Sequence, residues 1–280
     1  MMSASAINVL AALLEVRTGQ HTASHRSTRI DAALTPLMRA RGLDTLDDLV
    51  ARLLDGRDPA LAGHIVDALV NQETSFFRDT AVFDMMVDAV AAAEAQGRRV
   101  RIWSAGCSTG QEPLSLAMLF AERQEATGMP MPEIVASDIS TAALARARSG
   151  RFSQFEIQRG LPVRRMMRWF ESDGAEWTAR PELLRHIAFR QINLVADRPP
   201  GGMFDLILCR NVMLYLNPAP KAGAFDRLAG ALAPGGLLVL GAGETVIGQT
   251  DRFEPSGRFR GFYQSAQGQA GGGRAAAKAA

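Results

Sequence analysis

The chain has 280 residues, of which 47% are hydrophobic and 21% charged, values typical of folded globular proteins and not of disordered ones. Its formal net charge is +2 and its basic residues are scattered among acidic ones, which argues against a nucleic-acid partner. Two distant cysteines, Cys107 and Cys209, and unclustered histidines argue against a disulfide framework and against a metal site.

The N-terminal residues carry no pattern of a secretory signal. The apolar segment 7–16 is short, contains Glu15 and has no basic residues before it. No segment reaches the ~18 apolar residues that a membrane-spanning helix needs. We therefore expect a soluble cytoplasmic protein with no direct membrane insertion.

The first seventy residues predict helices only. Apolar residues recur with helical spacing in 7–16, 28–41 and 45–54, and Pro59 opens a shorter helix that ends near residue 70. No strand pattern interrupts them. Residues 1–72 are therefore predicted to form an N-terminal helical domain.

From Asp79 onward, helices and strands alternate. Helices are predicted at 79–96, from 112, at 141–149 and at 218–232, and strands at 100–103, 133–137, 187–192, 204–209 and 237–240. Short apolar strands separated by helices predict an α/β fold with a doubly wound parallel sheet. Ligands of such sheets bind at the carboxyl ends of the strands.

Two segments depart from this alternation. Residues 151–186 are polar and basic, with a helix predicted at 162–170 and a hairpin around Gly174, and are expected to form a small inserted subdomain. Residues 265–280 are rich in glycine and alanine and are predicted to be a disordered tail. The catalytic domain is then expected to span 73–264.

Small residues fill the turn after the first predicted strand, AGCSTG at 105–110. Gly106 and Gly110 are four residues apart and no lysine follows, so the turn fits neither a Walker A loop nor a dinucleotide fingerprint. A phosphate-binding loop and a nicotinamide dehydrogenase are both disfavoured.

Acidic residues near this turn favour a nucleoside ligand. Asp138 ends the next strand, where a carboxylate usually accepts both hydroxyl protons of a ribose. It also suits an N-cap, although Ser140 would cap the following helix at least as well. Glu112 is either a ligand contact or a first-turn acid favoured by the helix dipole. A ribose without a phosphate contact points to S-adenosylmethionine as a common candidate.

Six motifs follow one another in order: NQETSFFRD, WSAGCSTGQEPLSLAM, ASDIS, RSGRFSQFEIQRGLP, INL and FDLILCRNVMLYL. Together they resemble the CheR-type chemoreceptor glutamate methyltransferases, over almost the whole chain up to about Tyr263. The resemblance implies a helical N-terminal domain, a mostly parallel seven-stranded sheet of the class I S-adenosylmethionine methyltransferases, and a small inserted antiparallel subdomain. It also implies methyl transfer from S-adenosylmethionine to receptor glutamates, giving methyl esters.

The same resemblance suggests the site residues. Arg78 is expected beside the methionine carboxylate of the cofactor and the incoming substrate, and Tyr215 beside the transferred methyl group or, alternatively, in core packing. Gln72 stands where the family has asparagine, with Asn71 next to it, so the polar contact there stays open. The cofactor contacts that the resemblance implies are Gln72, Thr74, Arg78, Gly106, Glu112, Asp138, Asn193, Leu194, Asn211 and Val212. Taken alone, Asn193 and Asn211 would be interpreted as turn residues at strand ends.

The resemblance further suggests how a receptor would be recognised. Arg26, Arg29, Arg39 and Arg41 flank the helix at 28–41 and either contact the acidic receptor bundle or form a solvated face. The segment ESDGAEWTARPE is shorter than the Gly-rich hairpin of members that dock a receptor's C-terminal peptide, so such docking is not expected. Two alternatives remain: an S-adenosylmethionine methyltransferase acting on another substrate, such as a small carboxylate or RNA, and a non-catalytic module that binds S-adenosylmethionine.

Overall fold

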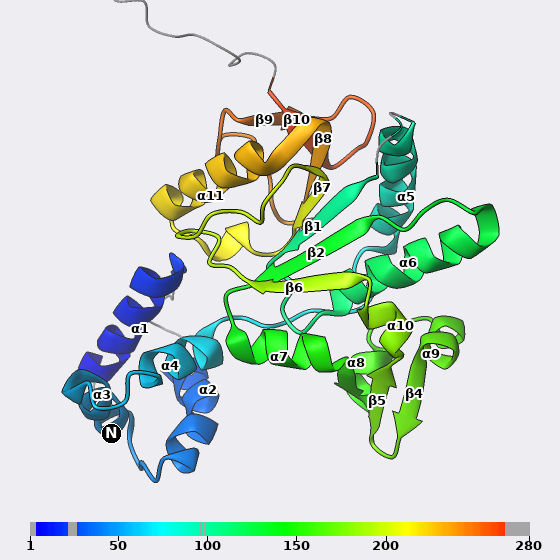
Figure 1. The fold of residues 1–280 in the computed structure, drawn as a ribbon. Helices are drawn as coiled ribbons and strands as arrows, with labels where there is room; N and C mark the ends of the chain where they lie inside the picture. The colour runs from blue at the N-terminus through cyan, green and yellow to red at the C-terminus, as the bar shows by residue number, and fades with distance from the viewer. Residues whose placement is uncertain (1–3, 22–26, 96, 98, 267–280) are drawn as a thin grey trace, which may run out of the picture.

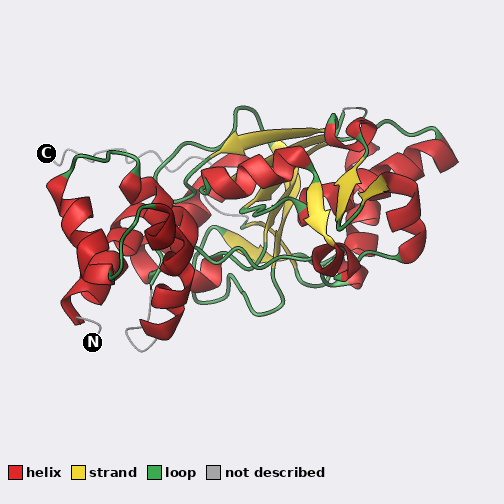
Figure 2. Cartoon of the chain, turned by 90° about the horizontal axis from the view of Figure 1, so that it is seen from below, coloured by secondary structure: helices red, strands yellow, loops and turns green. Residues whose placement is uncertain are grey.

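The computed structural model describes residues 4–21, 27–95, 97 and 99–266, and begins with four helices (Figure 1). These are α1 (Ala4–Thr18), α2 (Ser27–Ala40), α3 (Leu46–Asp55) and α4 (Leu61–Leu69). Their apolar faces meet in a core of their own, formed among others by Leu10, Leu34, Leu49 and Ile65. No helix in the described part of the chain is both long and apolar enough to cross a membrane. Figure 2 shows this helical region at one end of the molecule, beside the sheet.

A seven-stranded sheet forms the centre of the remaining chain, in the order β6-β2-β1-β7-β8-β10-β9. Its strands are β1 (Arg101–Ala105), β2 (Glu133–Asp138), β6 (Ile187–Gln191), β7 (Phe204–Cys209), β8 (Leu232–Leu240), β9 (Phe253–Pro255) and β10 (Phe262–Ser265). The first five strands of that order are parallel, and β10 pairs antiparallel with both β8 and β9. The order reverses at β1, so a cleft is expected there between β1 and β7.

Helices cover both faces of this sheet, which is the doubly wound arrangement that the sequence predicts. The covering helices are α5 (Thr80–Glu94), α6 (Gln111–Thr127), α7 (Thr141–Ser149) and α11 (Pro218–Ala231). Neighbouring strand residues point to opposite faces: Ile102 packs in the core with α5, α6 and α7, whereas Trp103 packs in the core with α11. All six residues of β7 are buried, and all are apolar except Asp205, whose Oδ2 accepts a hydrogen bond from Arg101 N at 2.9 Å.

The sheet differs from the predicted one at its C-terminal edge. Strand β8 begins at Leu232, five residues before the predicted start, because its pairing with β7 jumps from Leu232 to Leu237 across a bulge that holds Pro234 and Gly235. Strands β9 and β10 have only 3 and 4 residues, too few for a recognisable alternation. Ser265 was expected to be in a disordered tail but ends β10, while residues 267–280 lie outside the described part.

The inserted segment forms a three-stranded antiparallel sheet in the order β3-β5-β4. Its elements are β3 (Arg151–Ser153), α8 (Gln154–Gln158), α9 (Val163–Trp169), β4 (Phe170–Asp173), β5 (Glu176–Ala179) and α10 (Pro181–Leu184). The predicted hairpin turns at Gly174, with φ of 62°. The ring of Phe76 packs edge-on against Phe152 and Phe170, with centroids 5.1 and 5.6 Å away. The subdomain therefore anchors the segment that precedes α5.

Candidate cofactor and methyl-transfer site

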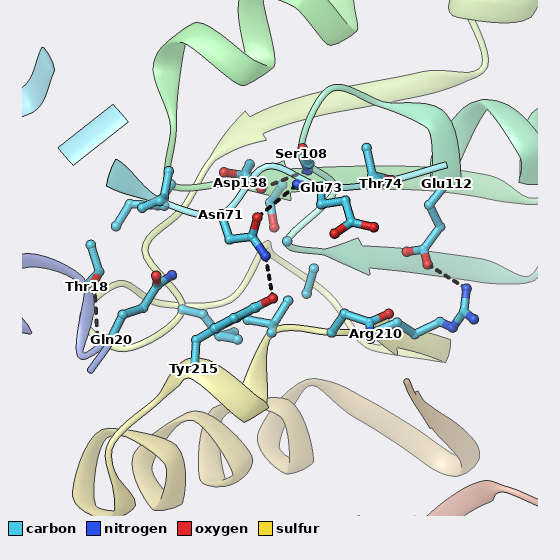
Figure 3. A pocket seen from close by; sticks show the side chains of 18 of the residues that line it. Thr18, Gln20, Asn71, Glu73, Thr74, Ser108, Glu112, Asp138, Arg210 and Tyr215 are labelled. Atoms are coloured by element: carbon cyan, nitrogen blue, oxygen red, sulfur yellow. Dashed lines mark hydrogen bonds and ion pairs between the residues drawn. The ribbon is translucent and has the colours of Figure 1, made fainter. Parts of the chain in front are cut away.

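A cavity opens at the carboxyl ends of β1, β2, β6 and β7 (Figure 3). Its position is the switch point of the sheet, where ligands of doubly wound folds bind. The loops after these strands form one wall. The other wall is formed by the segment 70–78, by Thr18 at the end of α1, and by Gln20 just after that helix.

The structure brings ten of the eleven predicted site residues to this cavity: Thr74, Arg78, Gly106, Glu112, Asp138, Asn193, Leu194, Asn211, Val212 and Tyr215. Gln72 is not among the lining residues. Its side-chain amide donates to the Asp67 carbonyl at 3.0 Å and to Ser140 Oγ at 3.2 Å, which turns it away. Asn71 lines the cavity instead, and its Nδ2 donates to Tyr215 Oη (Figure 3).

Glycine is required at two positions of the turn after β1, because each has a positive φ and no room for a Cβ. Gly106 has a φ of 79°, and a Cβ there would lie 2.4 Å from Val212 Cγ2. Gly110, with φ of 94°, is the N-cap of α6, and a Cβ there would lie 2.9 Å from Ala147 Cβ. The small residues therefore serve close packing of the turn against two neighbouring elements, as well as leaving the backbone open to the cavity.

Asp138 is fixed at the end of β2 by two backbone amides. Its carboxylate accepts hydrogen bonds from Ser108 N at 2.8 Å and from Ser140 N at 2.9 Å. Burial raises the pKa of this carboxyl, and the two backbone N–H bonds offset part of that rise. Ser140 caps α7 by accepting from Ala143 N at 3.0 Å, so the cap function does not fall on Asp138.

Glu112 lies in the first turn of α6 and both of its oxygens are occupied. Oε1 accepts from Ser104 Oγ at 2.8 Å, and Oε2 accepts from Arg210 Nη1 at 3.2 Å. The second nitrogen of that guanidinium, Nη2, donates to the Arg78 carbonyl at 2.9 Å and pairs with the Asp79 carboxylate. Sequence reasoning missed Arg210, although a charged residue directly after the four apolar residues 206–209 of a buried strand signals a buried charge that needs partners.

Arg78 is the second guanidinium at the cavity, and its environment is the opposite one. It is half-buried, and no described residue accepts a hydrogen bond from its side chain or forms an ion pair with it. It sits between Phe77 and Asp79, two non-glycine residues with φ of 46° and 60°. Backbone in this region is strained and typical of functional sites.

The loop after β7 is held by Glu244, a residue that sequence reasoning also missed. Glu244 Oε2 accepts from Asn211 N and from Gly241 N, both at 2.7 Å, and Oε1 accepts from Leu214 N at 3.1 Å. Asn211 has a φ of 60°. One carboxylate thus fixes the loop that carries Asn211, Val212 and Tyr215.

Asn193 lines the cavity while also acting as the turn residue that the sequence alone suggests. Its Oδ1 accepts from Val195 N at 3.1 Å, and its Nδ2 donates to the Arg17 carbonyl at 2.7 Å. The latter bond joins the loop after β6 to the end of α1. Two further bonds join the loop after β7 to residues that follow α1: Asn217 N donates to the Gly19 carbonyl at 2.9 Å, and His21 N donates to the Tyr215 carbonyl at 2.9 Å.

The basic residues suggested for receptor contact are only partly described. Arg39 is exposed, whereas Arg41 lies 3.4 Å from the Asp58 carboxylate and 2.8 Å from His64 Nδ1. Arg26 and the side chain of Arg29 lie outside the described part of the chain.

Comparison with known proteins agrees with this geometry. Residues 72–261 match the family model described as "CheR methyltransferase, SAM binding domain". The chemotaxis protein methyltransferase of Vibrio parahaemolyticus is 36% identical over 86% of this chain and 89% of its own length. Chemotaxis protein methyltransferase 1 of Pseudomonas aeruginosa is 34% identical over 86% of this chain and 90% of its own, and that of Vibrio cholerae is 36% identical over 86% and 89%. Most of the residues that line the cavity fall in the segment that matches the S-adenosylmethionine-binding domain, and the chain belongs to the CheR methyltransferase family.

Proposed function

We propose that this protein methylates glutamate side chains on the cytoplasmic helical bundle of chemoreceptors with S-adenosylmethionine as methyl donor, forming glutamyl methyl esters. One observation carries the proposal: a single cavity contains both a backbone-anchored carboxylate, Asp138, and a guanidinium, Arg78, that pairs with no side chain in the described part of the chain. The relatives' names supply the chemotaxis context. Such a receptor region would be reached from the cytoplasm.

The residues present fit S-adenosylmethionine. Each oxygen of Asp138 accepts one backbone N–H bond and retains a lone pair, so the carboxylate can still accept from two ribose hydroxyls. Asn193, Leu194, Asn211 and Val212 would border the adenine. When bound, the cofactor would supply a methyl group on a positively charged sulfur. An ionised oxygen in line with the carbon–sulfur bond could then bond to the methyl carbon as the sulfur leaves as a neutral thioether.

The protein's own groups then have to align and desolvate the acceptor. A glutamate acceptor is already ionised at neutral pH, so no general base is needed, and none of the described residues that line the cavity is a histidine. Arg78 can orient a carboxylate through charge-assisted hydrogen bonds. Because a very tight pair between Arg78 and the acceptor carboxylate would lower the nucleophilicity of the acceptor oxygen, we assign Arg78 a positioning role. Thr18, Gln20 and Val70 line the opposite wall, where they would limit the access of water to the reacting groups.

Labelled methyl transfer tests the proposal. The protein is incubated with methyl-labelled S-adenosylmethionine and receptor-containing membranes, and methyl release by mild base is measured. We expect base-labile label, the signature of a carboxyl ester, and at least a tenfold loss of kcat/KM in Arg78→Ala. Arg164→Ala, at an exposed arginine of α9, is the control and should match the wild type. A loss of less than twofold in Arg78→Ala would remove the role given to that residue.

The same assay separates the alternatives. Base-stable label, or label on RNA or a small carboxylate, would assign a methyltransferase with another substrate. Binding of S-adenosylhomocysteine without any transfer would assign a non-catalytic module.

Receptor tail peptides are not expected to bind tightly. The β4–β5 hairpin is short, with strands of 4 residues each joined at Gly174. Calorimetry with a peptide of the receptor's C-terminal residues should give no measurable heat. The proposed contact with the receptor bundle instead includes Arg39, so Arg39→Glu should raise KM for receptor membranes without changing affinity for S-adenosylhomocysteine.

A further inference from the structure

Arg210 is a buried cation that the reaction as described does not use. It directly follows β7, and its side chain is only 2% exposed. Its guanidinium carbon lies 6.0 Å from the centroid of the Phe83 ring. A charge buried to this degree is unfavourable unless its partners compensate for lost hydration.

Its partners come from two segments that are distant in the sequence from β7 and from each other. Nη1 donates to Glu112 Oε2 at 3.2 Å, at the start of α6. Nη2 donates to the Arg78 carbonyl and pairs with Asp79, in the turn before α5. One planar guanidinium therefore spans the space between α6 and this turn (Figure 3 shows the contact with Glu112).

The turn needs such support because its backbone is unfavourable. Phe77 and Asp79 both have positive φ, which non-glycine residues rarely adopt. The buried Phe77 fixes the first of them, and its N–H donates to Ser115 Oγ at 3.0 Å. Arg210 holds the other end of the turn. Arg78, between the two, lines the cavity.

Glu112 is held from the other side by the same guanidinium. Ser104 takes one carboxylate oxygen and Arg210 takes the other, so the carboxylate has little rotational freedom. Arg78 and Glu112 are the two cavity residues of opposite charge in contact with Arg210, one through its backbone carbonyl and one through its side chain.

We propose that Arg210 is a positioning residue that fixes Arg78 relative to Glu112 and so couples cofactor binding to alignment of the acceptor. The inference rests on the proposed function, in which Arg78 orients the acceptor carboxylate, and on the family resemblance, which implies that Glu112 contacts the cofactor. Arg210 is not assigned a contact with the transferred methyl group or the acceptor oxygen. It acts through Arg78 and Glu112, the two residues that it holds. Lysine at position 210 would keep the positive charge, but its single ammonium nitrogen cannot replace the two separate nitrogens of the planar guanidinium, Nη1 and Nη2.

The test compares Arg210→Lys with Arg123→Lys. Arg123 is a matched control, since it is also largely buried and forms a two-bond pair with Glu94. Affinity for S-adenosylhomocysteine, kcat, KM and the unfolding midpoint are measured for each. Arg210→Lys should weaken affinity about tenfold and lower kcat about tenfold at an unfolding midpoint similar to that of Arg123→Lys. Arg123→Lys should keep wild-type affinity and kcat.

A double-mutant cycle with Glu112→Gln gives a readout that a purely structural role would not move. If Arg210 acts through Glu112, the affinity loss of the double variant should be less than the product of the single losses by at least threefold. Wild-type affinity and kcat in Arg210→Lys, or losses that multiply, would overturn the inference. Failure of the proposed function is distinguishable, because then the wild-type protein itself gives no base-labile methyl transfer.

Discussion

The two walls of the cavity obtain their geometry in different ways. The strand-end wall comes from the sheet: Gly106 N and Cys107 N both donate to the Ser137 carbonyl, at 2.7 and 2.9 Å, which locks the turn after β1 to β2. The covering wall, from segment 70–78 and the end of α1, is not part of the seven-stranded sheet. It is held by the packing of Phe76 on the inserted subdomain and by single bonds between distant residues, such as the one that Ser108 Oγ donates to the Gln72 carbonyl at 2.8 Å.

This difference indicates which wall is rigid and which is adjustable. A ligand that needs a fixed shape, such as a nucleoside, suits the wall made by parallel strand ends. A wall held by a few buried charges and backbone bonds suits the part that must admit both a cofactor and a protein acceptor.

Gly106→Ala should damage the strand-end wall most. The added Cβ would lie 2.4 Å from Val212 Cγ2 at a φ of 79°, so we expect about 3 kcal/mol lower unfolding free energy and no measurable binding of S-adenosylhomocysteine. Gly174→Ala is the control, because its φ is 62° but nothing lies within 4 Å of the Cβ. That variant should lose about 1 kcal/mol and keep binding. Equal effects in both would refute a packing role for Gly106.

Glu244→Gln should release the loop that carries Asn211 and Tyr215. The amide nitrogen of glutamine cannot accept from backbone N–H groups, so at least one of the three bonds is lost, at a cost of about 2 kcal/mol. Hydrogen exchange at the Asn211 and Leu214 amides should accelerate, while exchange in β1 stays unchanged. Unchanged protection of those two amides would contradict the role assigned to Glu244.

Cofactor binding should weaken at mildly acidic pH because of Asp138. Burial raises the pKa of its carboxyl above the usual value, and a protonated carboxyl accepts hydroxyl protons less well. Affinity for S-adenosylhomocysteine should therefore begin to fall at a pH above that of an ordinary aspartate, and Asp138→Asn should remove this dependence. A pH-independent affinity between pH 7.5 and the ordinary aspartate pKa would argue against it.

The same shift affects the stability of the ligand-free protein in a defined direction. Because the folded-state pKa lies above the unfolded-state one, the stabilising contribution of Asp138 is complete below the unfolded pKa and is lost as the pH rises through the folded pKa. Urea titrations of the wild type and Asp138→Asn across this range would show the difference. If the unfolding free energy of the wild type, relative to that of Asp138→Asn, rose with pH across this range, the assignment would be contradicted.

Tyr215→Phe should have the smallest effect. The ring stays in place, and only the hydroxyl that accepts from Asn71 is removed, so we expect about 1 kcal/mol lower stability. If the hydroxyl lies beside the transferred methyl group, kcat falls several-fold with KM unchanged. An unchanged kcat would assign Tyr215 to packing alone, and Asn71→Ala would then behave in the same way.

Sequence patterns predicted the parts of the fold whose signal is local. Strand β7 is a run of buried residues at 204–209, and α7 lies between Ser140 and Gly150, so both were placed with correct bounds. The short strands β9 and β10 were missed because they depend on pairing with β8 and with each other rather than on their own sequence.

The site was predictable where a strand ends at the cavity. Gly106 and Asp138 follow from the general rule for parallel sheets, and the family motifs added Arg78 and Tyr215. Arg210 and Glu244 were missed because their partners are far away in the sequence, 98 positions for Glu112 and 33 for Asn211. The choice between Asn71 and Gln72 depends on which side chain Ser140 and Asp67 hold, and this is visible only in the fold.

A crystal structure of the complex with S-adenosylhomocysteine tests the central claim most directly. The account predicts the ligand at the β1–β7 switch point, with both ribose hydroxyls donating to the Asp138 carboxylate and its sulfur open toward Arg78 and Tyr215. A ribose placed away from Asp138, or a ligand bound outside this cavity, would contradict it.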